Sequence, residues 1–147
     1  MKQRQNSWTK LAVASALMIT AASSYAQKSD TKEMALFHDI YKELVEINTT
    51  DSVGNNTVAA KAMAKRLIDA GFKAEDIQIF EPFPRKGNMV IRFKGTGAKK
   101  PMLLLAHIDV VEAKREDWKT DPFQLKEDDQ FFTARGSIDD KAMAASF

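Results

Sequence analysis

Residues 101–111 read PMLLLAHIDVV, and residues 131–141 read FFTARGSIDDK. The first stretch opens with the apolar run 102–106, and a continuous run of this kind is typical of a strand buried on both faces. His107 and Asp109 follow the run directly. Because side chains alternate along a strand, these two point to the same side of it. They also stand where the predicted strand ends, which is where ligands bind in open α/β sheets.

The second stretch predicts another strand, over residues 131–134, which leads through a short loop into Asp139 and Asp140. We expect this acidic pair to lie close to His107, at the end of a neighbouring strand. Histidine nitrogen and carboxylate oxygen are ligands of zinc and of harder divalent metals. The two stretches together therefore predict a metal site, with His107 and Asp139 as the ligand candidates.

Helical and strand-like patterns account for the rest of the chain. Apolar residues first recur at helical spacing, and short apolar or alternating runs bounded by Gly and Pro follow. We therefore predict an α/β fold with a mixed, largely parallel sheet flanked by helices, in which the last two short strands pair as a hairpin. The expected helices cover residues 29–47, 57–70 and the segment after Asp140, and the expected strands cover 77–80, 89–93, 102–106, 123–125 and 131–134. Thr57 is the expected cap of the second helix, and Gly71 is expected to take the left-handed conformation that ends it.

The composition is that of an ordinary globular protein. The chain has 147 residues, 44% of them hydrophobic and 29% charged, which suits a single domain. It has no cysteine, so disulfides, thiolate metal ligands and cysteine nucleophiles are excluded. The net charge of +2 arises in the first 26 residues, which hold Lys2, Arg4 and Lys10 and no acidic residue. The charge therefore gives no argument for binding nucleic acid.

Residues 1–26 have the three parts of a secretory signal peptide. A basic start is followed by the apolar run 11–22 and then by the small-x-small sequence Ser24-Tyr25-Ala26. We predict cleavage after Ala26, no membrane anchor after processing, and a periplasmic or secreted product. The alternative is an uncleaved N-terminal anchor, but the apolar run is too short to span a bilayer comfortably.

Each candidate ligand also has a purely structural explanation. His107 could be a buried histidine that only forms hydrogen bonds, and Asp139 could cap the helix that follows it. Asp140 stands nearer to that helix and suits the cap better. The other histidine, His38, lies in the first expected helix without a partner at ligand spacing, so we expect it to be a surface or packing residue.

The motifs in the second half of the chain, taken together, resemble the M20 family of metallopeptidases. The matching residues are HIDVV at 107–111, Trp118, DPF at 121–123 and RGSIDDK at 135–141. That family includes zinc aminopeptidases, dipeptidases, carboxypeptidases, aminoacylases and deacylases. The resemblance extends back over the first two expected helices and so covers residues 30–147.

The resemblance implies a role for three residues. His107 matches a ligand of one metal ion, Asp109 matches the catalytic acidic residue that orients this histidine, and Asp139 matches the carboxylate that bridges both ions. It also implies a cis peptide bond between Asp139 and Asp140. The implied cofactors are two divalent metal ions, zinc first and cobalt as the alternative. The implied substrate is a peptide or an N-acyl amino acid, and the implied parent enzyme is a homodimer.

The family pattern continues with residues that this sequence does not contain. These are a Glu-Glu pair that supplies the general base and a metal ligand, a further acidic ligand and a late histidine. We therefore interpret residues 27–147 as the N-terminal portion of a truncated, incomplete zinc-peptidase-like catalytic domain. The parent is expected to hydrolyse amide bonds, and the piece by itself is expected to be inactive.

Two other functions stay open on the sequence. The first is a non-catalytic, metal-stabilised domain that binds a peptide or a protein partner. The second is a metal-dependent hydrolase of another bond type, such as a phosphoesterase, although the sequence has no glycine-rich loop for phosphate. Neither alternative involves nucleic acid.

Overall fold

The computed structural model describes residues 31–147. Two units are distinguished in the chain, Met1–Phe37 and His38–Phe147, and all of the strands belong to the second. The predicted signal peptide, residues 1–26, lies outside the described residues. Within residues 31–147, no helix combines the length and the apolar character that crossing a membrane requires.

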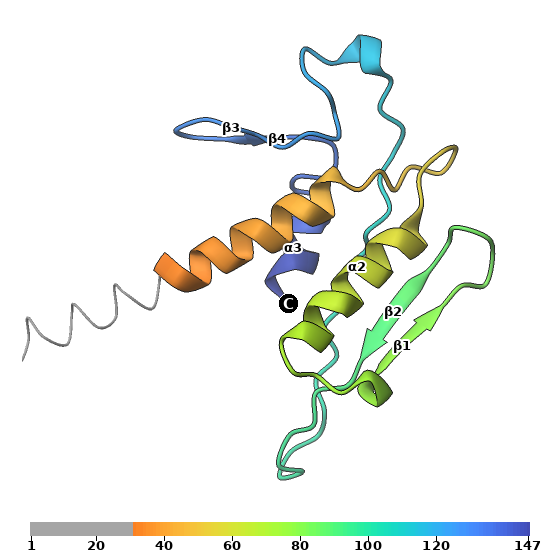
Figure 1. Cartoon of the computed structure of the whole chain (residues 1–147), viewed down its shortest axis with the longest axis vertical. Coiled ribbons are helices and arrows are strands. Elements are labelled where there is room, and N and C mark those ends of the chain that lie inside the picture. The colour runs from red at the N-terminus through yellow and green to blue at the C-terminus, as the bar shows by residue number, and fades with distance from the viewer. Residues whose placement is uncertain (1–30) are drawn as a thin grey trace, which may run out of the picture. The chain divides into compact units, whose positions relative to one another are not determined.

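The described residues form helices and two small antiparallel sheets (Figure 1). The first helix covers residues 31–46, as the helical spacing predicted. The elements after it are α2 (Asn56–Asp69), η1 (Ala74–Asp76), β1 (Ile77–Phe80), β2 (Asn88–Ile91), η2 (Arg115–Asp117), β3 (Lys126–Glu127), β4 (Phe132–Thr133) and α3 (Lys141–Ser146).

Helix α2 lies within one residue of its predicted bounds. Its N-cap is Asn55, whose side chain accepts a hydrogen bond from the Val58 amide, rather than the expected Thr57. Asparagine is as good a cap as threonine or better, so the helix begins one residue earlier. After the helix, Gly71 has a φ of 97°, the left-handed conformation that was predicted for it.

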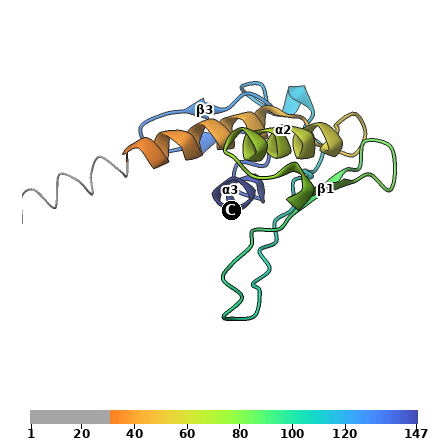
Figure 2. The same ribbon diagram turned by 60° about the horizontal axis from the view of Figure 1, so that its bottom comes forward.

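Strands β1 and β2 form an antiparallel hairpin that packs on α2 (Figure 2). Ile77 pairs with Ile91 and Ile79 with Met89, and these four are the half-buried residues of the two strands. The strands were correctly predicted to exist, and β2 begins one residue earlier and ends two residues earlier than expected. Their residues alternate between half-buried and exposed because one face of the hairpin lies on a helix and the other faces solvent.

The second hairpin, β3 and β4, packs on the helix at residues 38–46. The ring of Phe132 lies 5.5 Å from the ring of Tyr41, and the amide of Leu125 donates to the carboxylate of Glu46. The hairpin itself was predicted. Its first strand, however, lies three residues later than expected, because residues 121–124 instead form a turn that Asp121 closes by accepting from the Phe123 amide.

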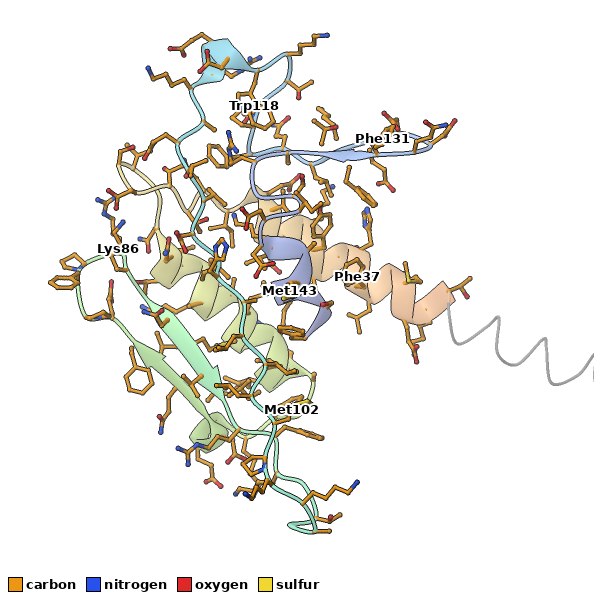
Figure 3. All side chains as sticks on the ribbon, turned by 180° about the vertical axis from the view of Figure 1, so that it is seen from behind. Phe37, Lys86, Met102, Trp118, Phe131 and Met143 are labelled. Atoms are coloured by element: carbon orange, nitrogen blue, oxygen red, sulfur yellow. The ribbon has the colours of Figure 1, made fainter. Side chains whose placement is uncertain are left out.

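The prediction of a buried strand over residues 102–106 is wrong for the described residues. The segment is extended, but no strand pairs with it, and Leu103 and Leu105 are 75% and 72% exposed. Figure 3 labels Met102 at one end of this extended stretch of chain and Trp118 beyond its other end. Both observed sheets are two-stranded and antiparallel, so a largely parallel sheet is not formed by the described residues. A strand needs a neighbour on which to form its hydrogen bonds, and an apolar run alone does not supply one.

Candidate metal centre

His107 and Asp139 meet, although 32 residues separate them in the chain. The His107 Nε2 lies 2.9 Å from a carboxylate oxygen of Asp139. His107 is carried by the extended segment after residue 106, and Asp139 by the loop that precedes α3. Both side chains are largely exposed. The structure thus brings together the two residues that the sequence nominated as metal ligands.

Asp109 contacts the other side of the same imidazole ring. The His107 Nδ1 lies 3.2 Å from the Asp109 main-chain carbonyl oxygen and 3.5 Å from its carboxylate. The carbonyl oxygen is the nearer acceptor, so the main chain as well as the side chain of Asp109 can orient the ring. With Nδ1 directed at Asp109, Nε2 is left for Asp139 or for a metal ion.

The pKa of His107 is raised above its ordinary value. Partial loss of solvent is the largest single influence and acts to lower the pKa of the imidazole. The hydrogen bonds to the Asp109 carbonyl and the Asp139 carboxylate, together with the negative charges of both residues, outweigh it. The surroundings of His107 therefore favour a positive charge, which is the electrostatic character of a site for a cation.

Asp140 contributes from the same loop. Its carboxylate accepts a long hydrogen bond of 3.4 Å from the His107 amide. Asp140 is also the residue before α3, as predicted, but its side chain makes no capping hydrogen bond. The peptide bond between Asp139 and Asp140 is cis, as the family resemblance implied.

The loop after the first helix supports the histidine segment. The Thr49 hydroxyl donates to the Ile108 carbonyl at 2.6 Å, and the Val110 amide donates to the Thr49 carbonyl at 3.2 Å. Further along, the carboxylate of Glu112 accepts from both the amide and the hydroxyl of Ser52, each at 2.9 Å. The segment that carries His107 and Asp109 is therefore attached side by side to residues 49–52.

The loop that carries Asp139 is attached to the end of the same helix. The Lys141 side chain is fully buried, and its ammonium group donates to the Ile47 carbonyl at 2.7 Å. Burial lowers the pKa of Lys141 to about 8. The Tyr41 hydroxyl donates to the Ser137 carbonyl at 2.8 Å. Sequence reasoning did not nominate Thr49 or Lys141, and a buried lysine has no signal in a single sequence that would reveal it.

His38 lies outside this cluster. Its Nε2 is 2.9 Å from a carboxylate oxygen of Glu127, and its ring packs at 5.9 Å from the ring of Phe132. It thus joins the helix to the β3–β4 hairpin. This contact agrees with the packing role that was predicted for His38.

The donor set at His107 and Asp139 fits part of a zinc site. Imidazole nitrogen and carboxylate oxygen bind zinc at about 2.0–2.2 Å, so two such ligands of one tetrahedral ion lie about 3.3–3.6 Å apart. The observed 2.9 Å between His107 Nε2 and Asp139 Oδ1 is a hydrogen-bond distance, so the two groups would separate by about half an ångström to hold one ion between them. Within residues 31–147, however, no group of three or more His, Cys, Asp or Glu side chains is arranged to hold a metal ion.

Comparison with known proteins matches the residues that carry this cluster. Residues 103–147 match the family model described as peptidase family M20/M25/M40. The chain is 31% identical over 119 residues to the acetylornithine deacetylase of Vibrio atlanticus, which covers 77% of this chain and 30% of that protein. It is 51% identical over 41 residues to the N-fatty-acyl-amino acid synthase/hydrolase PM20D1 of Xenopus tropicalis, which covers 28% of this chain and 8% of the relative.

The human PM20D1 protein is 48% identical over 42 residues, covering 29% of this chain and 8% of the relative. The chain thus spans less than a third of the length of each of these relatives. The strongest identity falls on a short region, and the family match covers the histidine segment, the acidic pair and the loop between them. Residues 103–147 are thus similar to peptidase family M20/M25/M40, and the relatives support an M20 family fragment.

Proposed function

We propose that the whole protein to which this sequence belongs is a metal-dependent hydrolase of amide bonds. The observation that carries the proposal is the 2.9 Å contact between His107 Nε2 and Asp139 Oδ1, within the residues that match the peptidase family. The names of the relatives support the bond type, because one removes an acetyl group from acetylornithine and the other acts on N-fatty-acyl amino acids. The substrate class is therefore an N-acyl amino acid or a peptide.

In this proposal each residue has a separate task. His107, through Nε2, and Asp139, through its carboxylate, hold the divalent cations, with zinc as the first candidate and cobalt as the second. Asp109 accepts from His107 Nδ1 and so holds the imidazole in the orientation and tautomer that leave Nε2 free to bind. A bound divalent ion supplies Lewis-acid activation of water and of the scissile carbonyl group.

The remaining parts of the proposal concern the whole protein. Residues 102–106 join a mixed, largely parallel sheet there, since an apolar extended segment that is exposed in this chain would be buried by neighbouring strands. The general base and the other metal ligands come from outside this sequence, and the active protein is a homodimer.

The protein is exported, and residues 1–26 are removed. N-terminal sequencing of the mature protein should then begin at Gln27, and a mature protein that still starts at Met1 would exclude processing.

The metal site is tested by removing each ligand and measuring bound zinc. In the whole protein we expect His107→Ala and Asp139→Ala each to lose most of the zinc that the unchanged protein retains after dialysis. His38→Ala is the matched control, because it removes the other histidine, which contacts Glu127 rather than Asp139. Zinc content that stays complete in both ligand variants would place the metal site elsewhere.

The 147-residue chain by itself is proposed to be inactive. A catalytic zinc ion normally keeps three protein ligands, and this cluster offers His107 and Asp139. Addition of zinc or cobalt to the chain should therefore give no hydrolysis of dipeptides or N-acetyl amino acids. Chelator-sensitive hydrolysis that disappears in His107→Ala would contradict this part of the proposal.

A further inference from the structure

The extended segment 101–112 is attached to the rest of the protein at few points. It pairs with no strand, and the backbone hydrogen bond that joins it to another part of the described chain runs from the Val110 amide to the Thr49 carbonyl. In a sheet, a ladder of such bonds would set the position of every residue. Here the position of the metal-site histidine depends instead on individual contacts.

Thr49 provides two of these contacts. Its hydroxyl donates to the Ile108 carbonyl at 2.6 Å, and its own carbonyl accepts from the Val110 amide at 3.2 Å. Ile108 lies between His107 and Asp109, so the two hydrogen bonds hold the peptide units on both sides of Asp109. Thr49 is also 1% exposed, so water has little access to replace its hydroxyl.

The residues beside Thr49 hold the other half of the cluster. Two residues earlier, the Ile47 carbonyl accepts from the buried Lys141 ammonium group, and Lys141 follows the Asp139–Asp140 pair directly. Residues 47–49 are therefore bonded to the histidine segment on one side and to the acidic loop on the other. The distance between His107 and Asp139 is set across this short piece of chain.

We propose that Thr49 is a positioning residue for His107 and Asp109. Its hydroxyl fixes the Ile108 carbonyl and thereby the placement of the imidazole opposite Asp139. The inference rests on the proposed metal site, and it adds a residue from a different part of the chain, 58 residues before His107, which acts through the Ile108 carbonyl and the Val110 amide. Loss of the hydroxyl leaves the Ile108 carbonyl without its donor and frees the segment to shift.

The test uses the 147-residue chain with three substitutions. Thr49→Val removes the hydroxyl at nearly constant volume, and Thr49→Ser keeps it. Thr57→Val is the matched control, because Thr57 is also buried, at 5% exposure, and its hydroxyl also donates one side-chain hydrogen bond, to Glu81 at 2.8 Å. The two measurements are the zinc dissociation constant, from competition with a chelator, and the hydrogen-exchange rate of the Val110 amide without metal.

We expect Thr49→Val to weaken zinc binding about 10-fold, in the range seen when a group that orients a ligand is lost. The Val110 amide should exchange faster in the same variant. Thr49→Ser should restore both values, and Thr57→Val should change neither relative to the unchanged chain. A purely structural loss of stability would affect Thr49→Val and Thr57→Val alike.

Zinc affinity and Val110 exchange that are both unchanged in Thr49→Val would overturn the proposal. If the unchanged chain binds no zinc, the proposed metal function fails for this chain, and the exchange rate alone then decides whether Thr49 holds the segment. If Thr49→Val does not fold, Thr49→Ser and Thr49→Ala replace it. Equal zinc affinity and equal Val110 exchange in those two variants would then count against a role for the hydroxyl.

Discussion

Asp109 orients the His107 ring through two groups, a carbonyl oxygen at 3.2 Å and a carboxylate at 3.5 Å. Asp109→Asn removes the negative charge but keeps the main-chain carbonyl, so part of the orienting contact survives. We expect zinc affinity to fall by about 10-fold, at the low end of the range for groups that orient a metal ligand. A chelator competition measures this value in the 147-residue chain.

The control for Asp109→Asn is Asp117→Asn, which removes one negative charge from the exposed η2 turn. It should leave zinc affinity unchanged. If the two substitutions weaken binding equally, the effect of Asp109 is one of general charge rather than of orientation.

Glu112 predicts a pH dependence of the loop contact beside the site. The Ser52 amide, and after it the Ser52 hydroxyl, hold the pKa of Glu112 below its ordinary value of 4.5. A lowered pKa in the folded protein means that the contact stabilises the fold above the ordinary glutamate pKa. The contribution is lost as the pH falls through the lower, folded pKa.

An NMR titration of the Glu112 carboxyl carbon tests this. Its midpoint should lie below 4.5 in the unchanged chain and should rise part of the way back in Ser52→Ala, which removes the hydroxyl but keeps the amide. A midpoint at or above 4.5 in the unchanged chain would show that Ser52 does not hold Glu112 in solution.

At the scale of elements, the loop before α3 packs closely against the histidine segment at Gly136. This glycine has a φ of 77°, and a Cβ there would lie 2.6 Å from Val110 Cγ1. Gly136→Ala therefore combines an unfavourable backbone conformation with a collision. We expect it to lower the free energy of unfolding by roughly 2–5 kcal/mol, from backbone strain and overpacking together.

Gly71→Ala separates the two causes. Gly71 also has a positive φ, 97°, but a Cβ there would meet no atom within 4 Å. The Gly71→Ala substitution should therefore lower the free energy of unfolding by about 1 kcal/mol, which is the cost of the backbone conformation alone. Denaturant titration of both variants measures the difference. Equal losses would mean that the loop before α3 does not pack tightly on Val110.

At the scale of the whole molecule, the extended segment exposes a contiguous run of apolar side chains. Met102, Leu103, Leu104 and Leu105 are between 51% and 82% exposed, on a segment with unpaired backbone groups. Exposed apolar segments of this kind associate with one another or with other chains. We therefore expect the chain by itself to self-associate as its concentration rises, which sedimentation velocity can follow.

Replacing Leu103 and Leu105 by Glu should raise the concentration at which association begins by about tenfold or more. Burial of one leucine side chain contributes about 1.5–3 kcal/mol, and 1.4 kcal/mol corresponds to a factor of ten. Val111→Glu is the control, because Val111 is 71% exposed but lies outside the run. An equal rise in the association concentration in Val111→Glu would indicate a general effect of charge. An unchanged chain that stays monomeric at all concentrations would contradict the expected self-association.

Local pattern was sufficient for most of the elements in this protein. The helical spacing before residue 47, the alternation at 77–80 and 89–93 and the glycine at 71 all depend on neighbours within a few residues, and each was predicted within one to three positions. The strand that was predicted at 102–106 is not formed by the described residues, because an apolar run shows only that a segment prefers burial. Whether a partner strand is present is a non-local property.

The sequence by itself determined which residues are the candidates for the metal site, because residue chemistry and spacing mark His107, Asp109 and Asp139 without any coordinates. Only the tertiary structure decided how they are held. The 2.9 Å contact of His107 with Asp139 closes a loop of 32 residues, and the support from Thr49 and Lys141 crosses 59 and 94 residues. Contacts over such separations depend on how the whole chain packs, and local patterns carry no record of that packing.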